Sequence, residues 1–334
     1  MFTERKRIKA HYFEIYKDKL FILEDDCSPL YVYDIHTFHL IAKLGDNYGG
    51  GLYAINDLVV DEHLKGVNVD TLSKVPSFYN CSNTYYYITN SKYIIIRKFI
   101  TDFSLELHIV RLDNYQIVRK IKDTSGTIRL FTESNDLICS TEDFLFLYKD
   151  FSLLWQKDLS KLTQYTEWDG TEEEGKIREV YHYKDSVIVL TQVFILQIDL
   201  QTGDIVYSLQ LPAGLMELSI VDNRAYGCYG YHYMEIDIEK GRLLKFIRIE
   251  NAVYQGKEYN AIMDSPKFHE GYVFHGVRLE GGYYAISALD AQTEKRIWID
   301  LLGTYMVEKI EFYENKMFVS DSGGSLYIYE KEDA

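Results

Sequence analysis

The 334-residue sequence predicts an all-β protein assembled from repeated units, and three observations lead to this prediction. A strand-turn-strand pattern returns along the chain. Its segments alternate apolar and polar residues over strand length, which is the periodicity of a β-strand and not of a helix. Tyrosine is abundant, with 30 residues against four prolines. Tyrosine favours strand positions, whereas proline removes a hydrogen-bond donor from a sheet, so the composition agrees with the pattern.

Each copy of the pattern is an apolar strand that ends in aspartate, a short turn and a second apolar strand. The aspartates are Asp34, Asp113, Asp199, Asp237 and Asp290. Two further short strands precede several copies, so that one unit contains four strands. A repeat of tens of residues built from four strands is typical of a blade of a β-propeller. We therefore expect residues 1–334 to form a single β-propeller domain.

The spacing of the units predicts seven four-stranded blades, with eight as the alternative. The seven segments are 9–44, 84–122, 127–159, 177–211, 216–250, 266–302 and 308–330. The last segment has only three strands, so we expect the N-terminal residues Phe2 to Ile8 to supply the fourth strand and close the ring, which removes exposed sheet edges. Residues 45–83 are either an insertion or a degenerate eighth blade with a turn at Asp70.

The segment ALDAQTEKRIW resembles the blade motif A-x-D-x-x-T-G-x-x-x-W of the PQQ-like propellers, which belong with the WD-repeat-like propellers in one superfamily. Four residues fit the motif: Ala288, Asp290, Thr293 and Trp298. Glu294 stands where the family usually has glycine. The resemblance implies a fold and no activity, because the family includes dehydrogenases, assembly scaffolds and binding proteins. Quinone-dependent members are similar in carrying adjacent cysteines, which this chain lacks, so no cofactor is expected.

Composition narrows the choice of partners and of compartment. The net charge of −15 argues against nucleic acid, whose binding needs lysine and arginine to replace counterions. We find no signal peptide and no stretch approaching the ~20 apolar residues of a membrane span, so we expect a cytoplasmic monomer without a membrane partner. The four cysteines, Cys27, Cys81, Cys139 and Cys228, are isolated and are expected to be reduced thiols.

Signatures of catalysis are missing from the sequence. The nine histidines are scattered, and there is no HExxH, GxSxG, P-loop or dinucleotide motif. Gly49 to Gly51 form a glycine-rich segment without a following helix and lysine, which we interpret as the exit from a strand and not as a phosphate site. Trp155 and Trp298 lie on the second strand of a repeat, where an indole packs between neighbouring blades. We expect neither an enzyme nor a metal protein.

One face of the predicted propeller is distinguished by its connections. Successive strands of a blade run in opposite directions, so the turns between second and third strands and the connections between blades emerge on the same face. The long connections belong to this face and include those at 160–176 and 251–266. Long segments without regular structure are uncommon in compact domains unless they are functional or disordered. The segments that we assign to this face carry 17 Asp or Glu against four Lys.

The same segments supply a predicted partner-binding surface. Its aromatic members are Tyr48, Tyr165, Trp168, Tyr254 and Tyr259, and its acidic members are Asp25, Asp26, Asp169, Glu172, Glu173 and Glu174. Tyrosine and tryptophan are frequent anchors of protein interfaces, and acidic residues around them speed the encounter with a basic partner. In the alternative reading the aromatic side chains pack against the blade beneath them, and the three consecutive glutamates are a solvated tip.

The sequence therefore favours a non-catalytic protein-binding propeller that holds a basic protein. The propeller itself would be either an inhibitor or immunity protein of a cationic toxin, or an assembly scaffold. The alternative is an enzyme of the lyase or hydrolase type with a carboxylate or Ca²⁺ site at the channel mouth. Its candidate ligands or acid and base groups are Asp25, Asp26, Asp102 and Asp321. We favour binding, because no histidine or arginine accompanies these acids on their loops.

Overall fold

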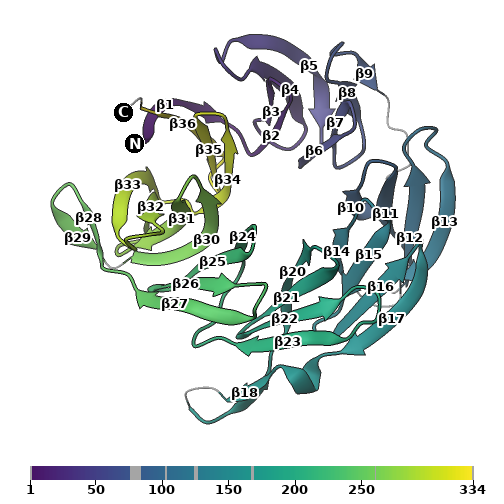
Figure 1. The fold of residues 1–334 in the computed structure, drawn as a ribbon. Helices are drawn as coiled ribbons and strands as arrows, with labels where there is room; N and C mark the ends of the chain where they lie inside the picture. The colour runs from purple at the N-terminus through teal and green to yellow at the C-terminus, as the bar shows by residue number, and fades with distance from the viewer. Residues whose placement is uncertain are drawn as a thin grey trace. The chain divides into compact units, whose positions relative to one another are not determined.

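The computed structural model describes residues 2–75, 84–101, 104–123, 127–166, 169–259 and 261–332. These residues form almost only antiparallel strands, with one short 3-10 helix, η1 (Ser160–Leu162) (Figure 1). Within this part of the chain there are eight four-stranded sheets and two two-stranded ones. The chain divides into two compact units. Unit 1 comprises Ser125–Ile310, and unit 2 comprises Phe2–Thr124 and Glu311–Ala334.

In unit 2, three sheets each pair four consecutive strands in chain order. They contain β2 (Tyr12–Tyr16), β3 (Lys19–Leu23), β4 (Ser28–Asp34) and β5 (Leu40–Tyr48); β6 (Leu52–Ile55), β7 (Leu58–Asp61), β8 (Gly66–Asn68) and β9 (Lys74–Val75); and β10 (Thr84–Thr89), β11 (Tyr93–Thr101), β12 (Ser104–Arg111) and β13 (Ile117–Asp123).

Both ends of the chain contribute to a further sheet with the order β1-β36-β35-β34. Its strands are β1 (Phe2–Lys9), β34 (Val307–Tyr313), β35 (Lys316–Asp321) and β36 (Ser325–Lys331). The register of β1 on β36 runs from Phe2 opposite Lys331 to Lys9 opposite Ser325. The N-terminal segment therefore supplies the fourth strand of the last sheet.

Unit 1 contains four sheets of consecutive strands and two small hairpins. The sheets contain β14 (Thr127–Phe131), β15 (Asp136–Ser140), β16 (Phe144–Lys149) and β17 (Ser152–Asp158); β20 (Ile177–Tyr183), β21 (Ser186–Thr191), β22 (Phe194–Asp199) and β23 (Ile205–Gln210); β24 (Ser219–Val221), β25 (Arg224–Tyr229), β26 (His232–Asp237) and β27 (Arg242–Arg248); and β30 (Ala261–His269), β31 (Tyr272–Leu279), β32 (Tyr283–Asp290) and β33 (Arg296–Gly303). The hairpins are β18 (Gln164–Thr166) with β19 (Glu172–Glu174), and β28 (Ala252–Tyr254) with β29 (Lys257–Tyr259).

The number of blades is eight, not the seven first expected, because β6 to β9 form a four-stranded sheet of their own. Its strands are short, and its turn has no aspartate at the position that Asp199 and Asp290 occupy in their blades. The side-chain oxygen of Asn68 accepts hydrogen bonds from the backbone N–H groups of Asp70 (3.1 Å) and Thr71 (2.9 Å). Asn68, not Asp70, thus accepts the hydrogen bonds of this turn. The blade was not recognised in the sequence, because the repeats were identified by an aspartate at this position.

Four of the five recurring aspartates, Asp34, Asp199, Asp237 and Asp290, close the turns between third and fourth strands. Asp113 does not, because β12 ends at Arg111, which takes the equivalent backbone position. One carboxylate oxygen of Asp199 accepts hydrogen bonds from the N–H groups of Gln201 and Thr202, both at 2.8 Å. Asp290 binds the N–H of Thr293 in the same way at 2.7 Å. These bonds stabilise the ionised carboxylate, so the Thr202 N–H and its neighbours lower the pKa of Asp199. The repeat is therefore a local turn motif, because the aspartate binds N–H groups within its own turn.

The hydrophobic core lies between neighbouring sheets. In unit 1, Leu147 of one sheet and Leu196 of the next belong to a single buried cluster, against which Trp155 packs. The indole N–H of Trp155 donates to the backbone oxygen of Leu200, the residue after the next sheet's turn aspartate, at 3.0 Å. Tyr207 repeats this contact one sheet later, donating its hydroxyl to the backbone oxygen of Ile238 at 2.7 Å. The expected packing of Trp155 between blades is confirmed.

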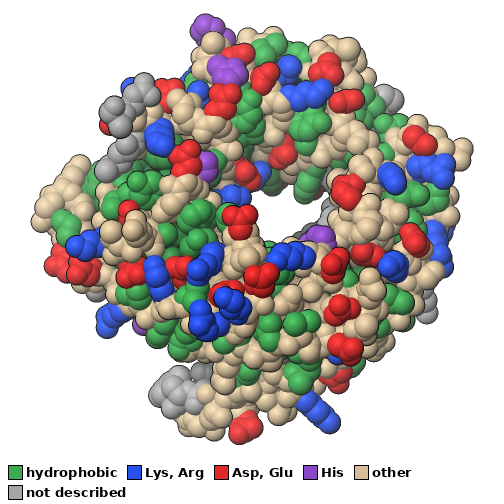
Figure 2. Space-filling model, viewed as in Figure 1, with side chains coloured by type: hydrophobic (Ala, Val, Ile, Leu, Met, Phe, Trp, Pro, Cys, Tyr) green, Lys and Arg blue, Asp and Glu red, His purple; other side chains and the backbone are tan. Residues whose placement is uncertain are grey.

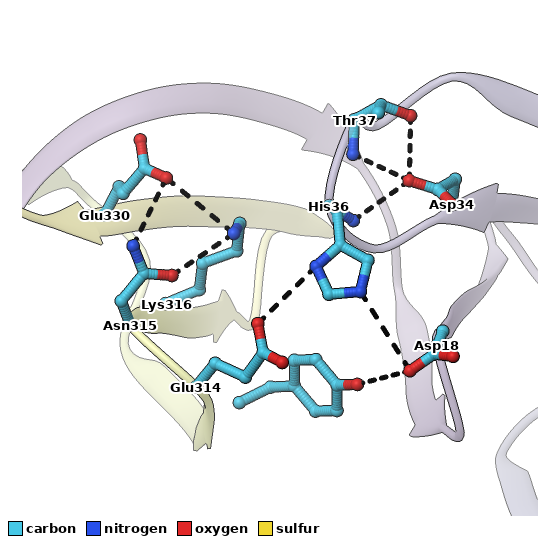
Figure 3. Close-up of polar contacts among 9 residues, drawn as sticks. Asp18, Asp34, His36, Thr37, Glu314, Asn315, Lys316 and Glu330 are labelled. Atoms are coloured by element: carbon cyan, nitrogen blue, oxygen red, sulfur yellow. Dashed lines mark hydrogen bonds and ion pairs between the residues drawn. The ribbon is translucent and has the colours of Figure 1, made fainter.

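Polar contacts join two sheets of unit 2, those of β2–β5 and of β34–β36 (Figure 3). The imidazole of His36 points between Glu314, at 3.5 Å from Nδ1, and Asp18, at 4.0 Å from Nε2. The hydroxyl of Tyr313 donates to the same Asp18 carboxylate at 2.6 Å, and this hydrogen bond raises the pKa of Tyr313 to about 12. The first complete sheet and the last sheet are therefore held by side chains as well as by their core.

The glycine-rich segment after β5 is occupied by the chain's own carboxylates. The N–H of Gly49 donates to the buried Asp61 at 2.8 Å, and the N–H of Gly50 donates to Glu62 at 3.0 Å. These backbone donors therefore hold the segment against β7.

Cys27, Cys139 and Cys228 are free thiols, whereas Cys81 lies outside the described residues. In the described part of the chain, no helix has the length and apolar character that crossing a membrane requires.

Candidate interaction surface

One end of the sheets in unit 1 carries the turns between second and third strands together with the connections between sheets. We call this end the loop face of unit 1. It comprises residues 141–143, 159–166, 169–176, 192–193, 211–218, 229–231, 249–259, 261–264, 280–283 and 303–306. The connections at 160–176 and 251–266, expected as long loops, carry the hairpins β18–β19 and β28–β29, which project from different sheets in Figure 1.

Large hydrophobic side chains are exposed on the loop face of unit 1. They are Leu162, Met216, Tyr229, Val253, Ile262, Tyr283, Tyr305 and Met306. The exposed fractions reach 60% for Val253 and 54% for Tyr305. The other exposed hydrophobic residues of unit 1 lie on fourth strands, and among the described residues none lies in the short turns at the opposite end of unit 1. A gathering of exposed apolar side chains marks an interaction surface more often than isolated ones do.

The space-filling view shows hydrophobic side chains reaching the surface between acidic and basic ones (Figure 2). Sequence reasoning named tyrosines and tryptophan but missed Met216, Tyr229, Tyr283, Tyr305 and Met306. A signal for these residues exists in the sequence. They stand in or beside turns and connections, outside the alternating strand pattern that would bury them.

The stem of the first hairpin is fixed to unit 1 by buried hydrogen bonds. The fully buried Thr163 donates its hydroxyl to the backbone oxygens of Leu159 (3.1 Å) and Gly175 (2.9 Å). The N–H of Gly175 donates to the backbone oxygen of Thr163, also at 2.9 Å. A Cβ atom at Gly175 would lie 2.9 Å from this oxygen, so the position needs glycine. The structure therefore holds the acidic end of the hairpin in a defined place.

The predicted binding residues of the first hairpin have different environments. Glu172, Glu173 and Glu174 are exposed and form β19. Asp169 is exposed and accepts a hydrogen bond from the N–H of Thr171 at 2.9 Å, which lowers the pKa of Asp169. Tyr165 is half-buried in β18, and Trp168 lies outside the described residues.

The second hairpin presents its two predicted tyrosines only in part. Tyr254 and Tyr259 are both half-buried. Tyr259 packs against the buried cluster that contains Ala252 and Val277, and the ammonium of Lys257 lies 4.7 Å from the centre of its ring. One side of the Tyr259 ring thus packs against the core, and the rest of the side chain is accessible to solvent.

Asp25, Asp26 and Tyr48 belong to unit 2. Asp25 pairs with the ammonium of Lys9, and this hydrogen bond lowers the pKa of Asp25. Asp26 is exposed. Tyr48 is only 5% exposed and belongs to the core between the sheets of β2–β5 and β6–β9. Tyr48 therefore packs against the neighbouring blade, as in the alternative reading of the sequence, and is not an exposed anchor for a partner.

The acids proposed for a catalytic or Ca²⁺ site do not share one environment. Asp25 is paired with Lys9, and Asp102 lies outside the described residues. Asp321 is buried and accepts hydrogen bonds from the N–H groups of Gly323 (3.0 Å) and Ser325 (2.9 Å). Across the described ranges, no three His, Cys, Asp or Glu side chains are placed to hold a metal ion.

A pocket of about 840 Å³ opens on the loop face of unit 1. Tyr165 and Thr166 of β18 line it together with Gln192 and the connection 211–216 between β23 and β24. The connection is pinned, because the N–H of Leu215 donates to the backbone oxygen of Gln192 at 3.1 Å. The pocket is therefore built from backbone that the fold holds in place, and one predicted binding residue, Tyr165, borders it.

Two further carboxyl groups lie together near this face. Asp264, near the start of β30, is half-buried, and burial followed by repulsion from Glu217 raises the pKa of Asp264 to about 6. In the folded protein the carboxyl of Asp264 thus binds a proton more tightly than in the unfolded chain. Asp264 therefore has no net effect on stability below about pH 4, where it is neutral in both states, and stability falls as the pH rises from about 4 to about 6, above which the buried charge is unfavourable.

We expect Asp264→Asn to stabilise the protein at pH 7.5 by about 2 kcal/mol, because the substitution removes a charge that burial disfavours. Below about pH 4 the two proteins should unfold at the same denaturant concentration, since Asp264 is then neutral in both states. Urea unfolding at several pH values measures the difference. Asp169→Asn is the control and should give no gain at pH 7.5, because the pKa of Asp169 is lowered. Equal stability of wild type and Asp264→Asn at pH 7.5 would contradict the prediction.

No family model matches the sequence, and no curated protein does. Solved structures match nearly the whole chain. The computationally designed Ika8 protein is 14% identical with a TM-score of 0.70, and 98% of each chain is covered. BamB from Moraxella catarrhalis is 9% identical with a TM-score of 0.66, covering 99% of this chain and 100% of its own. Sqt1 from Saccharomyces cerevisiae is 9% identical with a TM-score of 0.64, covering 99% and 98%.

BamB is a propeller of the PQQ-like kind, and Sqt1 is one of the WD-repeat kind. The fold is an eight-bladed β-propeller. The resemblance of the blade motif to these propellers is thereby confirmed. Identities of 9% and 14% show the fold alone, so function has to be argued from the surface of this chain.

Proposed function

We propose that this chain is a non-catalytic protein-binding β-propeller and that the loop face of unit 1 holds its partner. The observation that carries the proposal is the set of exposed apolar side chains on this face, which the described short turns at the opposite end lack. Large side chains such as Tyr283 and Tyr305 contribute most of the binding energy when a partner buries them. The hairpins extend the same face and enlarge the area that a partner can cover.

The partner that fits this face is a basic protein. Glu172, Glu173 and Glu174 are exposed in succession on the first hairpin, and Lys176 beside them is paired with Glu142 at 2.6 Å. Exposed acids at the edge of an interface attract a cationic partner and orient it. An inhibitor or immunity protein that covers the nucleic-acid site of a basic toxin, and a scaffold that holds a basic subunit, would both use this surface. Loss of the partner's activity in the complex would indicate the inhibitor.

The test compares two double variants of exposed apolar residues in unit 1. Tyr283→Ser with Tyr305→Ser changes the loop face, and Leu153→Ser with Val206→Ser changes outer strands of similar exposure. The wild type captures the partner from a lysate of the native host, and the affinity of the purified pair is measured by calorimetry. We expect the loop-face variant to bind at least about 30-fold more weakly, because it loses two anchors of about 1–2 kcal/mol each, and the control to bind normally. Equal binding by both variants would refute the assignment of the surface.

The charge of the partner is tested separately by Glu172→Gln, Glu173→Gln and Glu174→Gln in one variant. Because edge charges act on the encounter, we expect association at low salt to slow by about tenfold while dissociation changes little. Stopped-flow kinetics at several ionic strengths should also show a weaker salt dependence for the variant. A partner whose association rate is the same for wild type and variant at low salt is not recruited by these acids.

A further inference from the structure

The pocket on the loop face of unit 1 has the size and lining of a ligand site. Its volume of about 840 Å³ falls within the roughly 300–1,000 Å³ that is usual for such sites. The apolar part of the lining includes Val193, Leu211, Leu215, Met216 and Leu243. The polar part consists of uncharged side chains with one exception, Arg178. A second groove in unit 1, of about 710 Å³, is lined by several charged residues of both signs, so the single charge is particular to the first pocket.

Arg178 is the feature that indicates what the pocket binds. It lies in β20 and is half-buried. Its Nε atom is buried without a hydrogen-bond acceptor. Among the described residues, no carboxylate lies within ion-pair distance of this guanidinium. A guanidinium without an ion-pair partner binds a carboxylate through parallel hydrogen bonds. The pocket thus presents one unpaired cationic donor group beside an apolar wall.

We propose that this pocket binds the C-terminal residue of a partner polypeptide, with the terminal carboxylate on Arg178 and the apolar side chain against Met216 and Leu243. A chain terminus carries a carboxylate and a branched apolar side chain on the same residue. An internal Asp or Glu brings a carboxylate without that side chain. Recognition of this kind, through a terminal carboxylate, is a known mode of peptide binding. The acidic first hairpin, of which Tyr165 and Thr166 line the pocket, then faces the basic residues that precede the terminus.

This inference rests on the proposed function, because it assigns the ligand to a protein. The two are tested independently. Tyr283 and Tyr305, whose substitution tests the interaction surface, do not line the pocket. Small probes test the pocket without any partner. If the pocket binds the probes as expected but the partner binds normally to the Tyr283 and Tyr305 variant, the inference about the pocket stands. The proposed interaction surface is then refuted.

The experiment uses methyl-¹³C methionine labelling of the full chain, which has six methionines. Met216 lines the pocket and Met306 is exposed outside it, so the two methyl signals serve as reporter and internal control. Met216→Leu assigns the reporter. We expect N-acetyl-leucine to shift only the Met216 signal, with a Kd on the order of millimolar for a ligand of this size. N-acetyl-leucinamide, which lacks the charge, and N-acetyl-glutamic acid α-amide, which lacks the apolar side chain, should each bind at least about tenfold more weakly.

Two variants separate the role of Arg178 from general charge. Arg178→Gln should weaken N-acetyl-leucine at least about tenfold while the other methionine signals keep their positions, which shows that the fold is intact. Lys176→Gln removes a neighbouring charge outside the pocket and should bind as the wild type does. A Met216 signal that does not respond to N-acetyl-leucine, equal binding of the amide, or equal binding of the glutamic acid α-amide would each overturn the proposal.

Discussion

Deletion of residues 2–8 is expected to destabilise the protein by on the order of 5 kcal/mol or more, which is comparable to the whole stability of many domains. The deletion removes most of β1 and leaves β36 paired on one side only, with β35. Each lost backbone hydrogen bond costs about 1 kcal/mol net. Two side-chain contacts are lost as well, those of Phe2 with Phe312, whose ring centres are 6.2 Å apart, and of Arg7 over the ring of Tyr327 at 4.3 Å.

Thermal and urea unfolding of the shortened chain measure this loss. A synthetic peptide of the sequence FTERKRIK should restore stability in proportion to its concentration, because it can occupy the place of β1. Arg5→Ala is the matched control within β1. Arg5 forms an exposed ion pair with Glu330, at 3.3 Å, so its loss should cost less than about 1 kcal/mol. A shortened chain with the melting temperature of the full one would show that β1 contributes nothing to the fold.

Trp155→Ala is expected to destabilise the protein by about 3–4 kcal/mol, because the indole fills the space between two sheets of unit 1. The next sheet is shaped to receive it. Gly203 lies in the turn after Asp199, and a Cβ atom there would approach the indole to 2.9 Å. Gly203 also has a φ of +72°, which favours glycine. The substitution removes the packing and the hydrogen bond to Leu200 together.

Trp155→Phe keeps one aromatic ring but removes the N–H donor and part of the packed indole. We expect an intermediate loss of about 1–2 kcal/mol. Tyr207→Phe should lose about 1 kcal/mol for the same reason, through its bond to Ile238. Leu154→Ala is the control on the same strand. Leu154 is 46% exposed and should cost less than about 1 kcal/mol. Urea unfolding of the four variants gives the ranking, and a cost for Leu154→Ala that equals that of Trp155→Ala would contradict it.

Local chemistry made the repeats readable in the sequence. Asp199 and Asp290 recur because a carboxylate at the end of the third strand accepts the N–H groups of its own turn, a contact that lies within a few residues. The same reasoning explains the miscount of blades. Asn68 accepts the same two kinds of hydrogen bond without a charge, so the blade of β6–β9 has the turn of the others and lacks their aspartate.

The candidate surface was only partly predictable. The exposed acids Glu172 to Glu174 were found, because a run of charge requires solvent wherever it lies. Tyr48 was placed on the surface by its position in a long connection, whereas β5 continues to Tyr48 and buries its side chain against the next sheet. An aromatic residue suits a core and an interface equally well, and the sequence does not distinguish the two.

The sequence by itself determined the all-β class, the four-stranded unit, the turn motif and the contribution of the N-terminal strand to the last sheet. Each of these depends on periodicity or on hydrogen bonds between near neighbours. Only the tertiary structure decided which hydrophobic side chains stay exposed on the loop face and which segments enclose Arg178 in a pocket. Burial is a property of residues far apart in sequence, because β18, β20 and the connection 211–216 are brought together by the packing of sheets and not by their own residues.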